Sequence, residues 1–128
     1  MIKRLVSSAI PAPRFRYTPC IQSGPLYTVS GMIGLDFTTG SLAPGGVAAE
    51  TRQILNNLKA ALIDYGIGFE HMISARIYVV PFEQFGAVNA VWEEFFADIP
   101  PPARTSVGVS ALPLGAQIEI EFTFYRED

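Results

Sequence analysis

The chain contains one cysteine, Cys20, and one histidine, His71. A lone cysteine cannot form a disulfide within the chain, so nothing in the sequence indicates an oxidising compartment. Neither residue has the neighbouring cysteines and histidines that a zinc site requires. With a single histidine, no serine–histidine–acid triad can be assigned either. We therefore expect a site without metal, and we expect His71 to cap or precede a strand.

The sequence is also poor in charge. Charged residues make up 16% of the chain, against about 25% in typical globular domains. A single subunit of this composition exposes an unusually apolar surface, which predicts that sister subunits cover part of it. The net charge is −3. Nucleic-acid binding depends on basic patches, so we expect no nucleic-acid partner and a solvated N-terminal segment. The only basic cluster lies in that segment, at Lys3, Arg4, Arg14 and Arg16.

Long hydrophobic runs are absent as well. No stretch approaches the roughly 18 uncharged apolar residues of a membrane helix, and two serines interrupt the short apolar run after Arg4. We therefore expect no signal peptide, no membrane partner and a cytoplasmic location. The glycines at 45 and 46 lack the Lys-Ser/Thr of a phosphate-binding loop. The length suits one domain, to which we assign residues 1–128.

Changes of hydrophobic period predict the order strands, helix, strand, helix, strands. Apolar residues at three- and four-residue steps predict a helix over 47–65 that ends at Gly66. Pro81 opens a second helix, whose aromatic stripe we interpret as core. The turn sequence Ser23-Gly24-Pro25 predicts a hairpin between the first two strands. The predicted strands are 17–22, 26–30, 74–80, 104–109 and 118–124.

These elements predict an α+β sandwich in which both helices pack on one face of the sheet. The last strand alternates strictly, so that Glu119 lies opposite four apolar side chains, those of Ile118, Ile120, Phe122 and Phe124. In the preceding strand, Arg104 and Ser106 point away from its valines. If the helices cover the apolar faces, Arg104, Ser106 and Glu119 all lie on the opposite face, beside a cleft between subunits.

Arg104 and Glu119 are the candidate functional residues. Arg104 follows a rigid proline run, and its planar guanidinium suits bidentate recognition of a carboxylate. The alternative is a structural ion pair with Glu119 or Glu121. Glu119 lies between isoleucines, which favours a raised pKa and a role as proton donor or acceptor. The alternative for Glu119 is a paired or solvated carboxylate.

Four segments resemble the RidA/YjgF family, and together they span nearly the whole chain in order. They are SGMIGLDFTTG (30–40), ETRQILNNLKAAL (50–62), VNAVWEEFF (88–96) and PPARTSVGVSALPLGAQIEIEF (101–122). The resemblance implies a chorismate-mutase-like α+β subunit with a mixed sheet, and a homotrimer with ligand clefts between subunits. It also implies hydrolysis of 2-imino or enamino acids to 2-keto acids and ammonia, without metal or organic cofactor.

The resemblance also implies roles for individual residues. Arg104 matches the arginine that holds the substrate carboxylate, and Glu119 matches the glutamate linked to the hydrolytic water. The pocket-lining and supporting positions are Tyr17, Ser30, Gly31, Asn89 and Ser106, of which Ser106 replaces a common family cysteine. The ligand expected from this set is a small carboxylate metabolite.

This chain departs from the family pattern beside the expected pocket. It has Phe15-Arg16 where many active members have Gly-Pro, and Met32 where the family often has glutamine. These departures leave open a different substrate side chain or a lost activity. Imine hydrolysis is therefore our leading hypothesis, and a non-catalytic keto-acid sensor or partner-binding protein is the alternative. Ribonuclease or translation inhibition ranks last, because an acidic chain with one histidine suits RNA binding and cleavage poorly.

Overall fold

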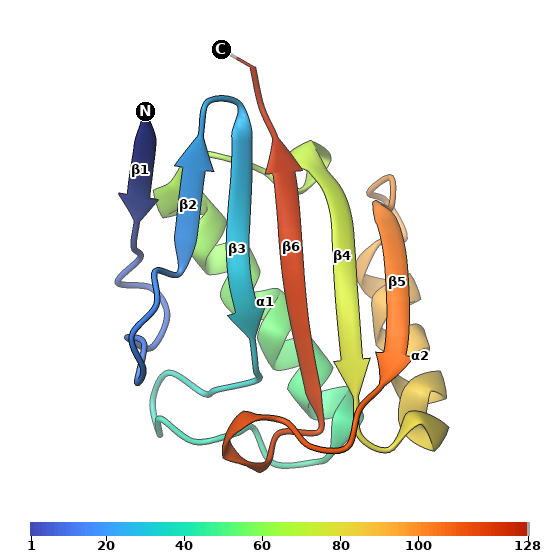
Figure 1. Cartoon of the computed structure of the whole chain (residues 1–128). Coiled ribbons are helices and arrows are strands. Elements are labelled where there is room, and N and C mark those ends of the chain that lie inside the picture. The colour runs from blue at the N-terminus through green and yellow to red at the C-terminus, as the bar shows by residue number, and fades with distance from the viewer. Residues whose placement is uncertain (128) are drawn as a thin grey trace.

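The computed structural model describes residues 1–127 as one mixed sheet and two helices (Figure 1). Six strands lie in the order β1-β2-β3-β6-β4-β5. Every neighbouring pair is antiparallel except β4 and β5, which are parallel and joined through α2. The strands are β1 (Ile2–Leu5), β2 (Cys20–Ser23), β3 (Leu26–Met32), β4 (Met72–Val79), β5 (Ala103–Gly108) and β6 (Ile118–Tyr125). The helices are α1 (Val47–Tyr65) and α2 (Phe85–Phe95).

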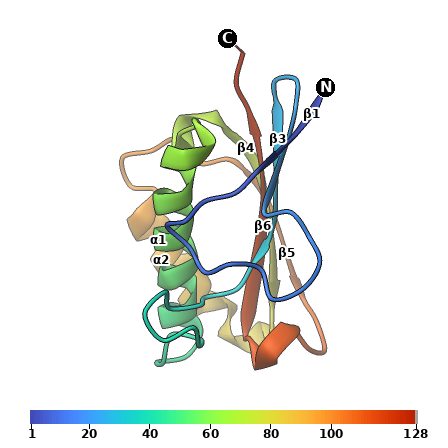
Figure 2. The same ribbon diagram turned by 90° about the vertical axis from the view of Figure 1, so that its left-hand side faces the viewer.

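Helices α1 and α2 pack on the same face of the sheet, and neither lies on the opposite face (Figure 2). This arrangement confirms the predicted α+β sandwich. We call the uncovered side the open face. Among residues 1–127, neither helix combines the length and the apolar character needed to cross a membrane.

Strand β6 lies between β3 and β4 and carries the centre of the core. Its four apolar side chains, at 118, 120, 122 and 124, are at most 1% exposed and face the helices. The side chains between them, including Glu119 and Glu121, are half-buried on the open face. The alternation predicted from the sequence is therefore confirmed, and it fixes the face on which Glu119 lies.

Helix α1 has the predicted bounds because its apolar stripe matches the helical period. Ile54, Leu55 and Leu58 lie on that stripe and are fully buried against the sheet. The helix ends at Gly66, which has a φ of 77° and donates its N–H to the Leu62 carbonyl at 2.9 Å. This left-handed position suits glycine, as the sequence predicted.

The second helix begins later than Pro81. Pro81 itself is extended, and a single 3₁₀ turn (Phe82–Gln84) precedes α2. The aromatic stripe is core in part, since Trp92 and Phe96 are 4% and 6% exposed. Phe82, in contrast, is 48% exposed, because the 3₁₀ turn carries it to the edge of the molecule.

The N-terminal strands differ from the prediction in extent. Residues 2–5, expected as a solvated extended segment, form the edge strand β1 and pair with β2, although Lys3 and Arg4 remain exposed. Strand β2 begins at Cys20 rather than at residue 17, after Pro19, which has no N–H to donate to a neighbouring strand. The predicted hairpin is present, with Ser23 paired to Leu26.

The predicted face of Arg104 and Ser106 is wrong. In the parallel pairing of β5 with β4, Arg104 aligns with Ala75 and Ser106 aligns with Ile77. Ala75 and Ile77 are at most 1% exposed and belong to the core on the helix side. Aligned residues of adjacent strands point to the same face, so Arg104 and Ser106 lie on the helix side and Glu119 lies opposite them.

Close packing of the edge strand on the aromatic turn explains this reversal. A Cβ added to Gly108 would lie 2.9 Å from the Cβ of Phe82. At position 108 the helix side of β5 therefore has no room for a side chain, and glycine meets this requirement. Val107 points to the open face instead, where it is 41% exposed. The assumption that valines face the helices fails at this edge strand because the aromatic rings already occupy that space.

We predict that Gly66→Ala destabilises the fold by about 1 kcal/mol, because alanine is strained in the left-handed region. A Cβ at position 66 would meet nothing within 4 Å, so the cost comes from the backbone alone. Gly86→Ala is the matched control, since Gly86 lies in α2 in equally open space without a positive φ. Urea unfolding should show a lower midpoint for the first variant and an equal or higher one for the second. Equal midpoints in the two variants would contradict the role assigned to Gly66.

Candidate functional site

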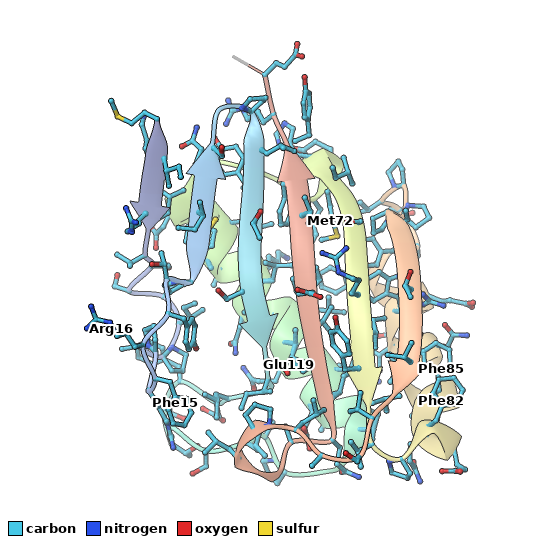
Figure 3. All side chains as sticks on the ribbon, in the orientation of Figure 1. Phe15, Arg16, Met72, Phe82, Phe85 and Glu119 are labelled. Atoms are coloured by element: carbon cyan, nitrogen blue, oxygen red, sulfur yellow. The ribbon has the colours of Figure 1, made fainter. Side chains whose placement is uncertain are left out.

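A hollow of about 520 Å³ lies on the open face, between the loop before β2 and the strands β3 and β6. We call it the open-face hollow. Four of the residues proposed from the sequence line it, namely Tyr17, Ser30, Gly31 and Glu119. Glu121 and the side chain of Phe15 line it as well. Figure 3 shows Glu119 on this face of the sheet and Phe15 in the neighbouring loop.

Glycine at position 31 allows the Glu119 carboxyl group to lie against the β3 backbone. A Cβ built at Gly31 would lie 2.9 Å from the Cδ of Glu119 and still closer to its Oε2. A side chain at this position would therefore push the carboxyl group away. The glycine is explained by this close approach and not by an unusual backbone conformation.

The two carboxylates of β6 lie in different electrostatic environments. Burial raises the pKa of Glu119, and the negative charge of Glu121 raises it further. A hydrogen bond from the Tyr78 hydroxyl lowers the pKa of Glu121, and Arg76 lowers it further through a 2.8 Å contact from its Nε. Glu121 is thus held ionised, while Glu119 is suited to exchange a proton closer to neutral pH.

Tyr17 and Ser30 form part of the wall of the hollow that Glu119 also lines. Burial raises the pKa of Tyr17, and the Glu119 charge adds to the effect, so its hydroxyl remains protonated. The Ser30 hydroxyl donates to the Thr18 carbonyl at 2.6 Å, and the Ser30 N–H donates to the Pro19 carbonyl at 2.9 Å. Ser30 therefore holds the loop that carries Tyr17, in addition to lining the hollow.

Arg104 lies on the other side of the sheet, over α2. Its guanidinium carbon is 5.4 Å from the ring centroid of Phe85 and 5.4 Å from that of Trp92. Both distances fall within the range of cation–π attraction, so the two rings orient the guanidinium without neutralising it. Asn89 lies beside Arg104, and both line a second hollow of about 340 Å³. Ser106 follows on the same face of β5.

The seven proposed site residues thus form two groups on opposite faces of the sheet. Tyr17, Ser30, Gly31 and Glu119 lie together, whereas Arg104, Asn89 and Ser106 lie on the helix side. Within residues 1–127, Arg104 makes no ion pair, so the structural alternative of a salt bridge to Glu119 or Glu121 is not found in the chain. One subunit therefore does not bring Arg104 and Glu119 to the same small molecule.

Sequence reasoning did not identify the groups that surround the two key residues. Arg76 and Tyr78 hold Glu121, and only the register of β4 on β6 reveals them, through the pair Arg76–Glu121. Phe85 and Trp92 were interpreted as core, although their rings also support Arg104. The signal that could have revealed this contact is a basic residue on the strand that follows an aromatic helix.

The departures at Phe15, Arg16 and Met32 fall in three different places. Phe15 lines the open-face hollow, whereas Arg16 points outward from the loop (Figure 3). Met32 lines a smaller cavity behind Ser30 and Gly31. His71 ends the 3₁₀ turn before β4, and its Nδ1 accepts the Gly68 N–H at 2.9 Å, which confirms the capping position predicted for it.

We predict that Glu119 titrates above, and Glu121 below, the ordinary glutamate range when their carboxyl carbons are followed by NMR. Glu121→Gln should lower the pKa of Glu119, because it removes a negative charge that opposes ionisation. Burial persists in this variant, so the pKa should remain raised. Glu83→Gln, which removes an exposed carboxylate before α2, serves as the control and should not move the Glu119 titration. An unchanged Glu119 pKa in Glu121→Gln would contradict the coupling.

Comparison with known proteins agrees with this fold. The family model described as Endoribonuclease L-PSP matches residues 7–125. A 2-iminobutanoate/2-iminopropanoate deaminase from Dermatophagoides farinae is 35% identical, over 93% of this chain and 93% of that protein. A RutC family protein from Pyrococcus horikoshii is also 35% identical, over 91% of this chain and 92% of that protein.

Solved structures match over nearly the full chain. The YjgF gene product of E. coli superimposes with a TM-score of 0.91 at 32% identity, covering 98% of this chain and 99% of that one. E. coli TdcF with bound serine has a TM-score of 0.91 at 26% identity, with the same coverage. The order of strands, the two helices on one face and these matches agree that the chain belongs to the endoribonuclease L-PSP family, also called the RidA/YjgF family.

Proposed function

We propose that this protein hydrolyses 2-imino or enamino acids to 2-keto acids and ammonia. The observation that carries the proposal is the half-buried Glu119 carboxyl, which has a raised pKa and lies against Gly31 beside the Tyr17 wall. Relatives of about the same length and 35% identity are named 2-iminobutanoate/2-iminopropanoate deaminase. TdcF binds serine, whose carboxylate and small side chain belong to the same class of ligand.

The reaction needs few groups. A water molecule attacks the carbon of an imine that is protonated on its nitrogen, and Glu119 accepts a proton from that water as the C–O bond forms. The resulting carbinolamine carries a hydroxyl and an amine on one carbon. Glu119 then returns its proton to the amine, the C–N bond breaks, and ammonia leaves. The hydroxyl proton passes to Glu119 as the C=O bond of the keto acid forms. Positioning and one proton relay are sufficient, because such imines already react with water unaided.

Arg104 is proposed to bind the substrate carboxylate from a second copy of the chain. The carboxylate and the imine carbon of a 2-imino acid are directly bonded, so both must lie in one cleft. Arg104 and Glu119 lie on opposite faces of the same sheet. A neighbouring subunit that covers the open face would bring its own Arg104 to Glu119, in a homotrimer that also covers exposed residues such as Val107.

Ribonuclease activity is less well supported, although the family description contains the word endoribonuclease. General acid–base cleavage of RNA commonly employs histidine. The only histidine, His71, is engaged as a cap before β4 and lines neither hollow described above. The net charge of −3 is also unfavourable for phosphate binding.

Arg104→Ala should lower kcat/KM for imine hydrolysis by about a hundredfold or more, since a bidentate, charge-assisted contact to the carboxylate is lost. The imine is generated from 2-aminobutyrate by an amino-acid oxidase, and semicarbazide traps what remains. Arg52→Ala is the matched control, because Arg52 is an exposed arginine on α1 and makes only a 3.9 Å surface pair with Glu94. Full activity in Arg104→Ala would refute the role proposed for Arg104, and no acceleration by the unaltered protein would refute the deaminase proposal. Tight binding of a keto acid without turnover of the imine would instead favour the sensor hypothesis.

A site shared between subunits also predicts complementation. Arg104→Ala and Glu119→Gln should each be inactive, but subunits of the two variants refolded together should recover activity. Random assembly from equal amounts places an intact Arg104 beside an intact Glu119 in about one interface in four, so about a quarter of the normal activity is expected. A mixture as inactive as its components would contradict the shared site, and light scattering would establish whether the variants assemble.

A further inference from the structure

A small cavity of about 70 Å³ lies behind the wall of the open-face hollow. Five residues line both spaces, so the two adjoin there: Tyr17, Val29, Ser30, Gly31 and Ile33. The remaining walls of the cavity are mainly apolar, and they include Pro11, Pro13, Pro19, Met32 and Leu35. We call this space the rear cavity.

Tyr65, the last residue of α1, supplies an unused polar group to the rear cavity. Its side chain lines the cavity and is only 5% exposed. Among the buried side-chain nitrogen and oxygen atoms of the residues that the structure describes, the Tyr65 hydroxyl is the one without a hydrogen-bond partner. A buried hydroxyl without a partner is unfavourable, and a polar group that enters the rear cavity would remove this cost.

Two other polar side chains of the rear cavity, those of Ser30 and Asn57, already have partners. The Ser30 hydroxyl donates to the Thr18 carbonyl. The Asn57 amide donates to the Leu35 carbonyl at 2.8 Å and accepts from Gln53 at 2.8 Å. Burial raises the pKa of Tyr65 to about 12, and nearby groups, Cys20 first among them, add to the effect. The Tyr65 hydroxyl therefore stays protonated, so it can both donate and accept a hydrogen bond.

The border between the two spaces coincides with the proposed site of reaction. Glu119 lies against Gly31, and Gly31 also lines the rear cavity. An imine carbon placed beside Glu119 therefore lies next to this border, and the mainly apolar rear cavity adjoins the position of a substituent on that carbon. A liquid water molecule occupies about 30 Å³, so the cavity suits a substituent of two or three non-hydrogen atoms.

We propose that the rear cavity receives the side chain of the 2-imino acid and that the Tyr65 hydroxyl hydrogen-bonds a hydroxyl group on that side chain. This inference rests on the proposed deaminase function and defines its substrate class. Short 2-imino acids with a hydroxylated side chain are preferred over alkyl analogues of the same size. The preference arises because an alkyl group leaves the Tyr65 hydroxyl without a partner, whereas a hydroxyl group satisfies it.

Two pairs of substrates with matched size test the proposal. The first pair is the imines of serine and 2-aminobutyrate, and the second pair is the imines of homoserine and norvaline. An amino-acid oxidase generates each imine from its amino acid. Within each pair, the two side chains differ only by OH in place of CH₃. The unaltered protein should have the higher kcat/KM for the hydroxylated member of at least one pair. Tyr65→Phe should lower the ratio of kcat/KM for the hydroxylated substrate to kcat/KM for the alkyl substrate about tenfold, since it removes one hydrogen bond and retains the ring.

The matched control is Tyr125→Phe, which removes a tyrosine hydroxyl that bonds Glu127 near the end of β6. It should leave the ratio unchanged. If Tyr65→Phe also leaves the ratio unchanged, or slows both members equally, the hydroxyl serves only a buried water or the fold, and the proposal is overturned.

Binding of the corresponding 2-keto acids separates this inference from the proposed function. Calorimetry should show tighter binding of the hydroxylated keto acid, and Tyr65→Phe should remove the difference. If that result occurs while no imine is hydrolysed faster, the rear-cavity assignment stands and the deaminase proposal fails. If neither keto acid of either pair binds, the rear-cavity assignment fails together with the carboxylate site.

Discussion

The strict alternation of β6 at the centre of the sheet is the constraint on which the other features depend. Its isoleucines and phenylalanines pack on the helices, so its two glutamates must face the open side. A shift of one residue would bury both carboxylates in the core and expose the apolar side chains. Because β6 lies between β3 and β4, Glu119 meets Gly31 on one side and Tyr78 on the other. Its position beside the open-face hollow is therefore a consequence of core packing.

The same strand also explains how two carboxylates acquire different properties. Glu119 and Glu121 are two residues apart and share one face, so the charge of Glu121 opposes the ionisation of Glu119. Arg76 and Tyr78, on the adjacent strand, hold only Glu121. The fixed charge on Glu121 then raises the pKa of Glu119 beyond the effect of burial alone. One group is thereby held ionised, and the other is left able to exchange protons.

Packing at the edge strand separates the proposed anion anchor from the proposed base. The rings of Phe82 and Phe85 stack with centroids 5.2 Å apart beside the small residues of β5. Arg104 lies over Phe85 and Trp92 on that side, with no carboxylate partner among residues 1–127. The guanidinium is thus oriented but still charged. In the proposed trimer this separation makes assembly part of the site, because each cleft takes its arginine from one subunit and its glutamate from another.

Local pattern in the sequence was sufficient for helix α1, its end at Gly66, the alternation of β6 and the face on which Glu119 lies, because each depends on periodicity or on one backbone conformation. The face of Arg104 was not predictable in this way. It depends on which side of an edge strand the aromatic turn at Phe82 fills, and that contact joins segments far apart in the chain. The partners of Glu121 depend likewise on the register of β4, and the rear cavity depends on how α1 meets the loop before β2. These features were decided by tertiary packing, because hydrogen-bond register and close contacts between distant segments leave no periodic signal in the sequence.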